Sequence, residues 1–148
     1  MNLPQLPEYH FADLSAELSM LVLATTLGLA QLVAAARAGN RQRGLKWNVG
    51  PRDEEAPPIG KIAGRLERAR RNFMETYPFF VALILIGAVI GRHNWATLTG
   101  AELYVLGRLV YVPLYAFGVP VLRTLVWLAA SIGILIVLAG LAAPQLFA

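Results

Sequence analysis

The sequence contains no cysteine, only two histidines and few charged residues. Without cysteine, the chain has no thiol nucleophile of its own, no disulfide framework and no cysteine-ligated metal site. The two histidines, His10 and His93, show none of the histidine and carboxylate spacings that are typical of metal ligands. We therefore expect no metal site.

Low charge is the most restrictive of these features. Charged residues make up 15% of the 148 residues, hydrophobic residues make up 57%, and the mean hydropathy is +0.55. This composition is too apolar for an ordinary soluble domain of this length. Residues 18–36 and 125–148 contain no charged side chain, and as helices both are long enough to cross a hydrocarbon core of about 30 Å.

Two further apolar stretches, residues 72–91 and 101–118, contain isolated charges. Together the four stretches predict an all-α integral membrane protein, a four-helix transmembrane bundle formed by residues 1–148 as a single domain. We expect the helices at about 12–37, 66–91, 101–118 and 121–147. Residues 38–64, rich in glycine, proline and charge, form the expected first loop.

The positive charge is concentrated in one part of the chain. Most of the 13 lysines and arginines lie between Arg37 and Arg71, so the positive-inside rule predicts that the first loop is cytoplasmic. A basic segment also suits nucleic acid or anionic lipid, but topology with lipid contact explains it, and we expect no nucleic-acid partner. Glu8, Asp13 and Glu17 precede the first apolar stretch, which argues against a cleaved signal peptide.

The second expected helix begins with a polar face. Arg68, Arg71, Asn72 and Glu75 follow the spacing i, i+3, i+4 and i+7, which places all four on one side of a helix. A charged side chain at the centre of a membrane-spanning helix costs about 2.5 to 3.5 kcal/mol. Such residues therefore face the interior of the bundle or a polar ligand.

The third expected helix carries a similar stripe, formed by Tyr104, Arg108, Tyr111 and Tyr115. Tyr104 suits an anchor at the membrane interface, whereas the hydroxyl groups of the two deeper tyrosines need partners. Two interpretations of Arg108 stay open at this point. It forms a structural pair with a carboxylate such as Glu75, or it contacts a ligand directly.

The fourth expected helix opens with Arg123 and Thr124, and Trp127 follows on the same side. Arg123 could reach the lipid headgroups. Alternatively, its permanent charge could stabilise a thiolate or carboxylate, with the hydroxyl group of Thr124 as a second donor. Three helices thus bring cations and hydroxyl groups to one level, which favours a small anionic, peptide-like molecule as the ligand.

Two segments of the sequence resemble a known family. They are RARRNFMETYPFF, residues 68–80, and GRLVYVPLYAFGVPVLRTLVW, residues 107–127. Both are similar to segments of the membrane-associated proteins in eicosanoid and glutathione metabolism, the MAPEG family, which includes microsomal glutathione transferases and prostaglandin E synthase. The resemblance extends over nearly the whole chain, including the basic first loop and its GPRDE run.

This resemblance implies a homotrimer that binds glutathione as a cosubstrate between subunits, near the cytoplasmic face. It implies that Arg123 stabilises the glutathione thiolate and that Asp53 is a loop acid that handles a proton, so these two are the expected catalytic residues. The remaining expected contacts to glutathione are Arg37, Arg68, Arg71, Asn72, Glu75, Tyr111, Tyr115, Thr124 and Trp127.

Two positions depart from the prostaglandin synthase branch, which has histidines where this chain has Arg70 and Tyr111. The resemblance therefore implies a bacterial-type relative in the inner membrane, a detoxifying glutathione transferase or peroxidase that acts on lipophilic small molecules. Two other classes stay open. One is a non-catalytic glutathione- or lipid-binding scaffold, and the other is a small transporter, which would need polar positions along a full path across the membrane.

Overall fold

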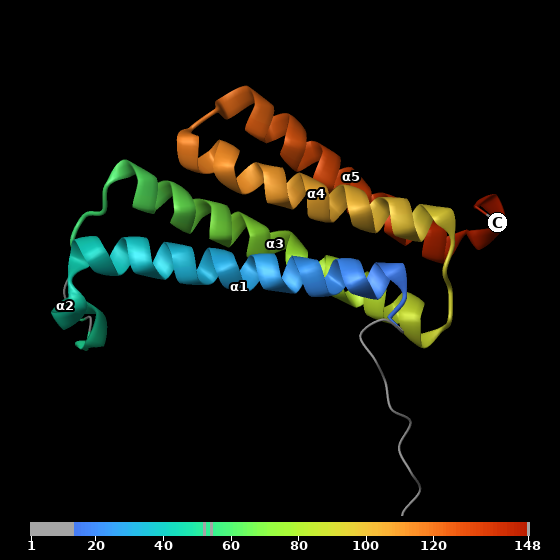
Figure 1. The fold of residues 1–148 in the computed structure, drawn as a ribbon, viewed down its shortest axis with the longest axis horizontal. Coiled ribbons are helices and arrows are strands. Elements are labelled where there is room, and N and C mark those ends of the chain that lie inside the picture. The colour runs from blue at the N-terminus through green and yellow to red at the C-terminus, as the bar shows by residue number, and fades with distance from the viewer. Residues whose placement is uncertain (1–13, 52, 54, 148) are drawn as a thin grey trace, which may run out of the picture.

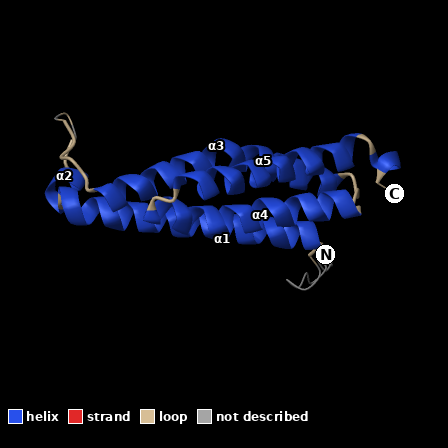
Figure 2. Cartoon of the chain, turned by 90° about the horizontal axis from the view of Figure 1, so that it is seen from above, coloured by secondary structure: helices blue, strands red, loops and turns tan. Residues whose placement is uncertain are grey.

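The structure is a computed structural model, which describes residues 14–51, 53 and 55–147. The described chain is helical, and its elements are α1 (Ala16–Arg43), α2 (Leu45–Val49), α3 (Lys61–Val89), α4 (Trp95–Phe117), α5 (Pro120–Ala142) and the short 3-10 helix η2 (Pro144–Leu146). The long helices run along one another in an elongated array, with α2 at one end (Figures 1 and 2). The expected all-α class is confirmed for these residues.

Three of the described helices are long and apolar enough to cross a membrane, namely α1, α3 and α5. The chain is therefore a membrane protein. The sequence predicted a fourth span, but α4 is not among the helices that length and composition identify. Its polar side chains explain the difference, because α4 contains both Glu102 and Arg108.

The helices begin and end at other residues than the sequence predicted. Helix α1 continues beyond residue 37 to Arg43 and stops where Gly44 adopts a φ of 83°. Helix α3 begins at Lys61, and α2 occupies part of the connection, so the expected loop 38–64 is largely helical at both ends. Arg41, Gln42 and Arg43 at the end of α1 and Lys61 at the start of α3 have good helix propensity, which favours these extensions past the apolar stretches.

Helices α4 and α5 pack closely because glycines face each other. A Cβ atom on Gly100 would lie 2.6 Å from the carbonyl oxygen of Gly133, and the reciprocal distance is also 2.6 Å. The helices are joined at Gly118, whose φ of 79° makes the tight turn. The Nη1 of Arg65 on α3 donates to the carbonyl oxygen of Ala116 at 3.2 Å, which ties this turn to α3.

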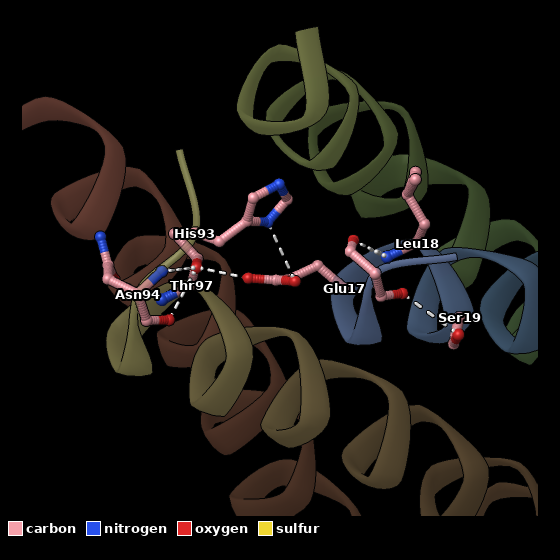
Figure 3. A network of polar contacts seen from close by, with 7 residues as sticks. Glu17, Leu18, Ser19, His93, Asn94 and Thr97 are labelled. Carbon is pink, nitrogen blue, oxygen red and sulfur yellow. Dashed lines mark hydrogen bonds and ion pairs between the residues drawn. The ribbon is translucent and has the colours of Figure 1, made fainter. Parts of the chain in front are cut away.

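The opposite end of the molecule is held by a network around Glu17, which Figure 3 shows. The hydroxyl group of Thr97 donates to the buried Glu17 carboxylate at 2.7 Å, and His93 Nδ1 lies 3.2 Å from its other oxygen. Thr97 also forms a capping box with Asn94, whose side-chain amide donates to the carbonyl oxygen of Gly140 at 2.9 Å. The starts of α1 and α4 and the end of α5 are thereby fastened together.

Candidate functional site

Arg108 is the most buried charged residue of the described chain, with 1% of its surface exposed. Its Nη1 donates to Asn72 Oδ1 at 2.8 Å and its Nη2 donates to Thr76 Oγ1, so two residues of α3 hold it. The guanidinium carbon also lies 5.5 Å from the ring centre of Tyr104 and 5.5 Å from that of Tyr111. Hydrogen bonds and cation–π contacts thus compensate the charge of Arg108 between α3 and α4.

A cavity of about 190 Å³ opens beside this group. Helices α3, α4 and α5 form its walls, and its lining residues are Asn72, Tyr111, Tyr115, Arg123, Thr124 and Trp127. All six are residues that the sequence analysis proposed for the ligand site. Helical spacing aligns the lining residues of α4 and α5, because Tyr111 and Tyr115 are four positions apart, as are Arg123 and Trp127.

Arg123 provides the positive charge of this cavity. Its guanidinium carbon lies 4.4 Å from the ring centre of Tyr115, which in turn makes an edge contact with Tyr111 at 5.4 Å between ring centres. No carboxylate of the described residues forms an ion pair with Arg123. Its charge is therefore free to attract an anion in the cavity, where partial burial strengthens the attraction.

Two hydrogen-bonding groups complete the lining. The hydroxyl group of Thr124 donates to the carbonyl oxygen of Pro120 at 3.1 Å, so its oxygen is positioned mainly as an acceptor and the expected donor role is already occupied. The indole Nε1 of Trp127 is buried and has no hydrogen-bond partner among the described residues. A buried donor without a partner is costly, and an acceptor atom on a ligand would satisfy it.

Comparison with family models matches residues 20–143 to the MAPEG family. The chain belongs to the MAPEG family. The match includes most of α1 and all of α2 to α5, and thus every residue that lines the cavity. The search of curated proteins finds no match to the chain, and neither does the search of solved structures.

In this MAPEG protein, Arg108 forms no ion pair with a carboxylate of the described residues. Glu75 is exposed and does not bond to Arg108 directly, since its Oε2 accepts from Asn72 Nδ2 at 3.1 Å. Asn72 and Thr76 are four residues apart and face α4, whereas Glu75 points outward. The amide of Asn72 therefore stands between the two charges, and the direct pair is wrong.

Other expected site residues lie elsewhere in the chain. Arg68 and Arg71 line a second cavity, on the side of α3 near the end of α1. Arg37 on α1 is exposed and lines neither cavity. The same is true of Asp53, which lies in the connection between α2 and α3. The single MAPEG chain thus gathers polar groups around Arg123, but not the arginines that were expected at the ligand carboxylates.

The sequence analysis missed Thr76 and Arg65, which position the cavity without lining it. Thr76 lies one helical turn after Asn72, so its spacing was a usable signal. Arg65 gave no such signal, because its partner is a backbone carbonyl group 51 residues away.

Proposed function

We propose that this MAPEG protein is a glutathione-dependent membrane transferase, in which Arg123 stabilises the glutathione thiolate for attack on lipophilic electrophiles. The observation that carries the proposal is the cavity around Arg123, which has a cation without a described acidic partner and an unbonded indole donor. Both features favour an anionic ligand with acceptor atoms.

The proposed chemistry follows from the charge of Arg123. A guanidinium next to the sulfur favours the thiolate over the thiol and so lowers the thiol pKa of the bound ligand. The thiolate attacks an electrophilic carbon, a sulfur–carbon bond forms, and the leaving group departs with its electron pair. This sequence needs no acid in the cavity, which agrees with the position of Asp53 outside it.

A peroxidase activity is consistent with the same site. The thiolate sulfur attacks the terminal oxygen of a lipid hydroperoxide, the O–O bond breaks, and the lipid alkoxide takes up a proton from water to give the alcohol. A second glutathione then converts the sulfenic acid of the first to the disulfide and releases water.

We infer that the chain forms a homotrimer, and the size of the cavity supports a site that a second copy completes. At about 190 Å³, the cavity is smaller than the 300 to 1,000 Å³ that is typical of small-molecule sites. Arg68 and Arg71 face away from it in the same subunit. We infer that a second copy of the chain brings its own Arg68, Arg71 and Arg37 to the carboxylates of glutathione, and that Glu75 of the first copy lies at this interface.

The proposed orientation in the membrane follows from charge and packing. We infer that α4 crosses the membrane with α1, α3 and α5, since Arg108 is buried among protein groups rather than in lipid. The basic end, with α2 and the cavity around Arg123, then faces the cytoplasm of a bacterial inner membrane. A lipophilic substrate would reach the thiolate from the bilayer.

A direct test measures glutathione conjugation of a chlorodinitrobenzene by the detergent-purified full chain. We expect turnover to fall by about 10²-fold in Arg123→Ala, because the loss of one donor that stabilises negative charge in an active site has an effect of about this size. Arg41→Ala is the matched control, because Arg41 is an exposed arginine of α1 that lines neither cavity. Saturable glutathione binding without turnover would favour the scaffold function instead. The position of Asp53 outside the cavity is compatible with that function as well.

A further inference from the structure

The second cavity has a volume of about 390 Å³ and lies where α1 ends and α3 begins. Its lining residues are Arg43, Ile59, Gly60, Lys61, Gly64, Glu67, Arg68 and Arg71. Four of these side chains are cationic and one is acidic. The glutathione proposal assigns no role to Arg43 or Lys61, so half of the cations in this cavity are unexplained.

Glu67 does not compensate the four cationic side chains, because it is paired with a residue that does not line the cavity. Glu67 accepts from Arg70 Nη2 at 2.6 Å and from Arg70 Nε at 3.1 Å. Among the described residues, no ion pair involves Arg43, Lys61, Arg68 or Arg71. The cavity therefore concentrates positive charge that nothing in the described chain neutralises.

Arg43 is held at the wall of the cavity by contacts that leave its charge available. Its Nε donates to the carbonyl oxygen of Pro57 at 3.2 Å, and its guanidinium carbon lies 5.0 Å from the ring centre of Trp47. These contacts fix the position of the side chain. They involve a neutral carbonyl group and an aromatic ring, and so supply no opposing full charge.

Two glycines keep this cavity open. A Cβ atom on Gly64 would lie 3.3 Å from Arg68 Nη1, and one on Gly60 would lie 3.4 Å from the amide of Gln42. Gly60 has no side chain that could cap α3, and among the described residues Gln42 Oε1 accepts only from the N–H of Gly60 itself. The first backbone N–H groups of the helix therefore add a smaller positive contribution to the same field.

The position of the cavity along the helices points to a ligand from the membrane surface. The apolar part of α3 begins at about Phe73, and Arg68 lies about 7 Å before it along the helix axis. Arg43 lies about 10 Å beyond Ala36, where the uncharged part of α1 ends. The headgroup region begins directly outside the hydrocarbon core, so anionic headgroups have access to this level.

We propose that this cavity binds the phosphate headgroup of an anionic phospholipid, with Arg43 and Lys61 as the contacts that distinguish it from a glutathione site. Free phosphate has the same chemistry but lacks acyl chains, which stay in the bilayer beside α1 and α3 and raise the local concentration of the headgroup.

The test uses the full chain purified in neutral detergent, with phosphatidylglycerol titrated in mixed micelles and binding followed by thermal shift. Phosphatidylcholine and inorganic phosphate form the two comparison arms. The variant is Arg43→Gln with Lys61→Gln. Its matched control is Arg41→Gln with Lys46→Gln, which removes two charges from residues that do not line the cavity. Lys61→Gln alone serves if the double variant folds poorly, since exposed Lys61 makes no described hydrogen bond.

We expect the affinity for phosphatidylglycerol to fall by about 30-fold in the cavity variant, as for loss of two headgroup contacts, and to change little in the control. The glutathione thiolate signal should persist in the cavity variant. Equal losses of lipid affinity in both variants would overturn the proposal, as would inorganic phosphate that binds as tightly as the lipid. Loss of the thiolate signal together with lipid affinity would assign the cavity to glutathione. Selective loss of lipid affinity in a protein that never forms a thiolate would refute only the proposed function.

Discussion

Asn72 links Arg108 to Glu75, since its Oδ1 accepts from Arg108 Nη1 at 2.8 Å while its Nδ2 donates to Glu75 Oε2 at 3.1 Å. An amide is the side chain that offers both functions in one plane. Because Asn72 also lines the cavity around Arg123, the buried guanidinium behind it fixes how the amide faces a ligand. Arg108 is thus a positioning residue for the proposed site.

Replacement of Arg108 tests this arrangement. Arg108→Leu should destabilise the protein by about 3 kcal/mol, because it removes two charge-assisted hydrogen bonds and leaves Asn72 and Thr76 without their donor. Thermal unfolding in detergent measures the effect, and Arg41→Leu, an exposed arginine on α1, is the control. An equal unfolding temperature for the two variants would contradict the structural role of Arg108.

Substitution of Gly100 tests the close packing of α4 on α5. Gly100→Ala should lower the unfolding temperature, since the added Cβ would lie 2.6 Å from the carbonyl oxygen of Gly133 and the helices must separate. Gly39→Ala is the control, because no atom lies within 4 Å of its Cβ position. Gly39 lies in α1, so its replacement should stabilise the helix by up to about 1 kcal/mol. A change of the unfolding temperature in the same direction in both variants would contradict the close packing of α4 on α5.

The turn at Gly118 positions Arg123 and permits a second matched comparison. Gly118→Ala should weaken glutathione binding, because the residue has a φ of 79° and its Cβ would lie 2.5 Å from the Arg65 guanidinium. Gly91→Ala introduces similar backbone strain, at a φ of 64°, with no atom within 4 Å of its Cβ. Calorimetric titration should show weaker binding for the first variant alone. Comparable affinities in both would show that the turn does not position the site.

The network at the opposite end should affect stability without affecting the ligand. Thr97→Val removes the hydrogen bond to Glu17 and breaks the capping box with Asn94, at an expected cost of about 1 to 3 kcal/mol. Glutathione affinity of the folded variant should equal that of the wild type. A variant with the stability of the wild type but weaker glutathione binding would contradict this prediction, because it would mean that the Glu17 network and the site around Arg123 are coupled.

Helical spacing allowed much of the candidate site to be predicted. Around the smaller cavity, the lining residues of α4 and of α5 are spaced three or four positions apart, and Asn72 is the one lining residue of α3. Their part in glutathione chemistry stays a prediction. The sequence could not separate Arg71 from Asn72, although they are neighbours, because which cavity each one lines depends on how α3 is rotated against α1 and α4.

Long-range partners account for the other differences. The Thr97 hydroxyl group reaches Glu17 across 80 residues, and no local pattern in the sequence marks that pairing. A direct bond from Arg108 to Glu75 was suggested by charge alone, whereas in the structure Nη1 and Nη2 of Arg108 bond to neutral oxygens of α3 and its Nε has no hydrogen-bond partner among the described residues. The predicted helix ends also differ from those in the structure, since hydropathy indicates where a helix leaves the lipid rather than where its backbone hydrogen bonds stop.

The most direct test of the account is the ultraviolet difference spectrum of the glutathione thiolate on addition of glutathione to the detergent-purified protein, compared with Arg123→Ala and with Arg41→Ala. The account predicts a saturable thiolate signal in the wild type and in Arg41→Ala, and its loss in Arg123→Ala. A thiolate signal of equal size in Arg123→Ala, or none in the wild type, would contradict the claim that Arg123 stabilises the reactive sulfur.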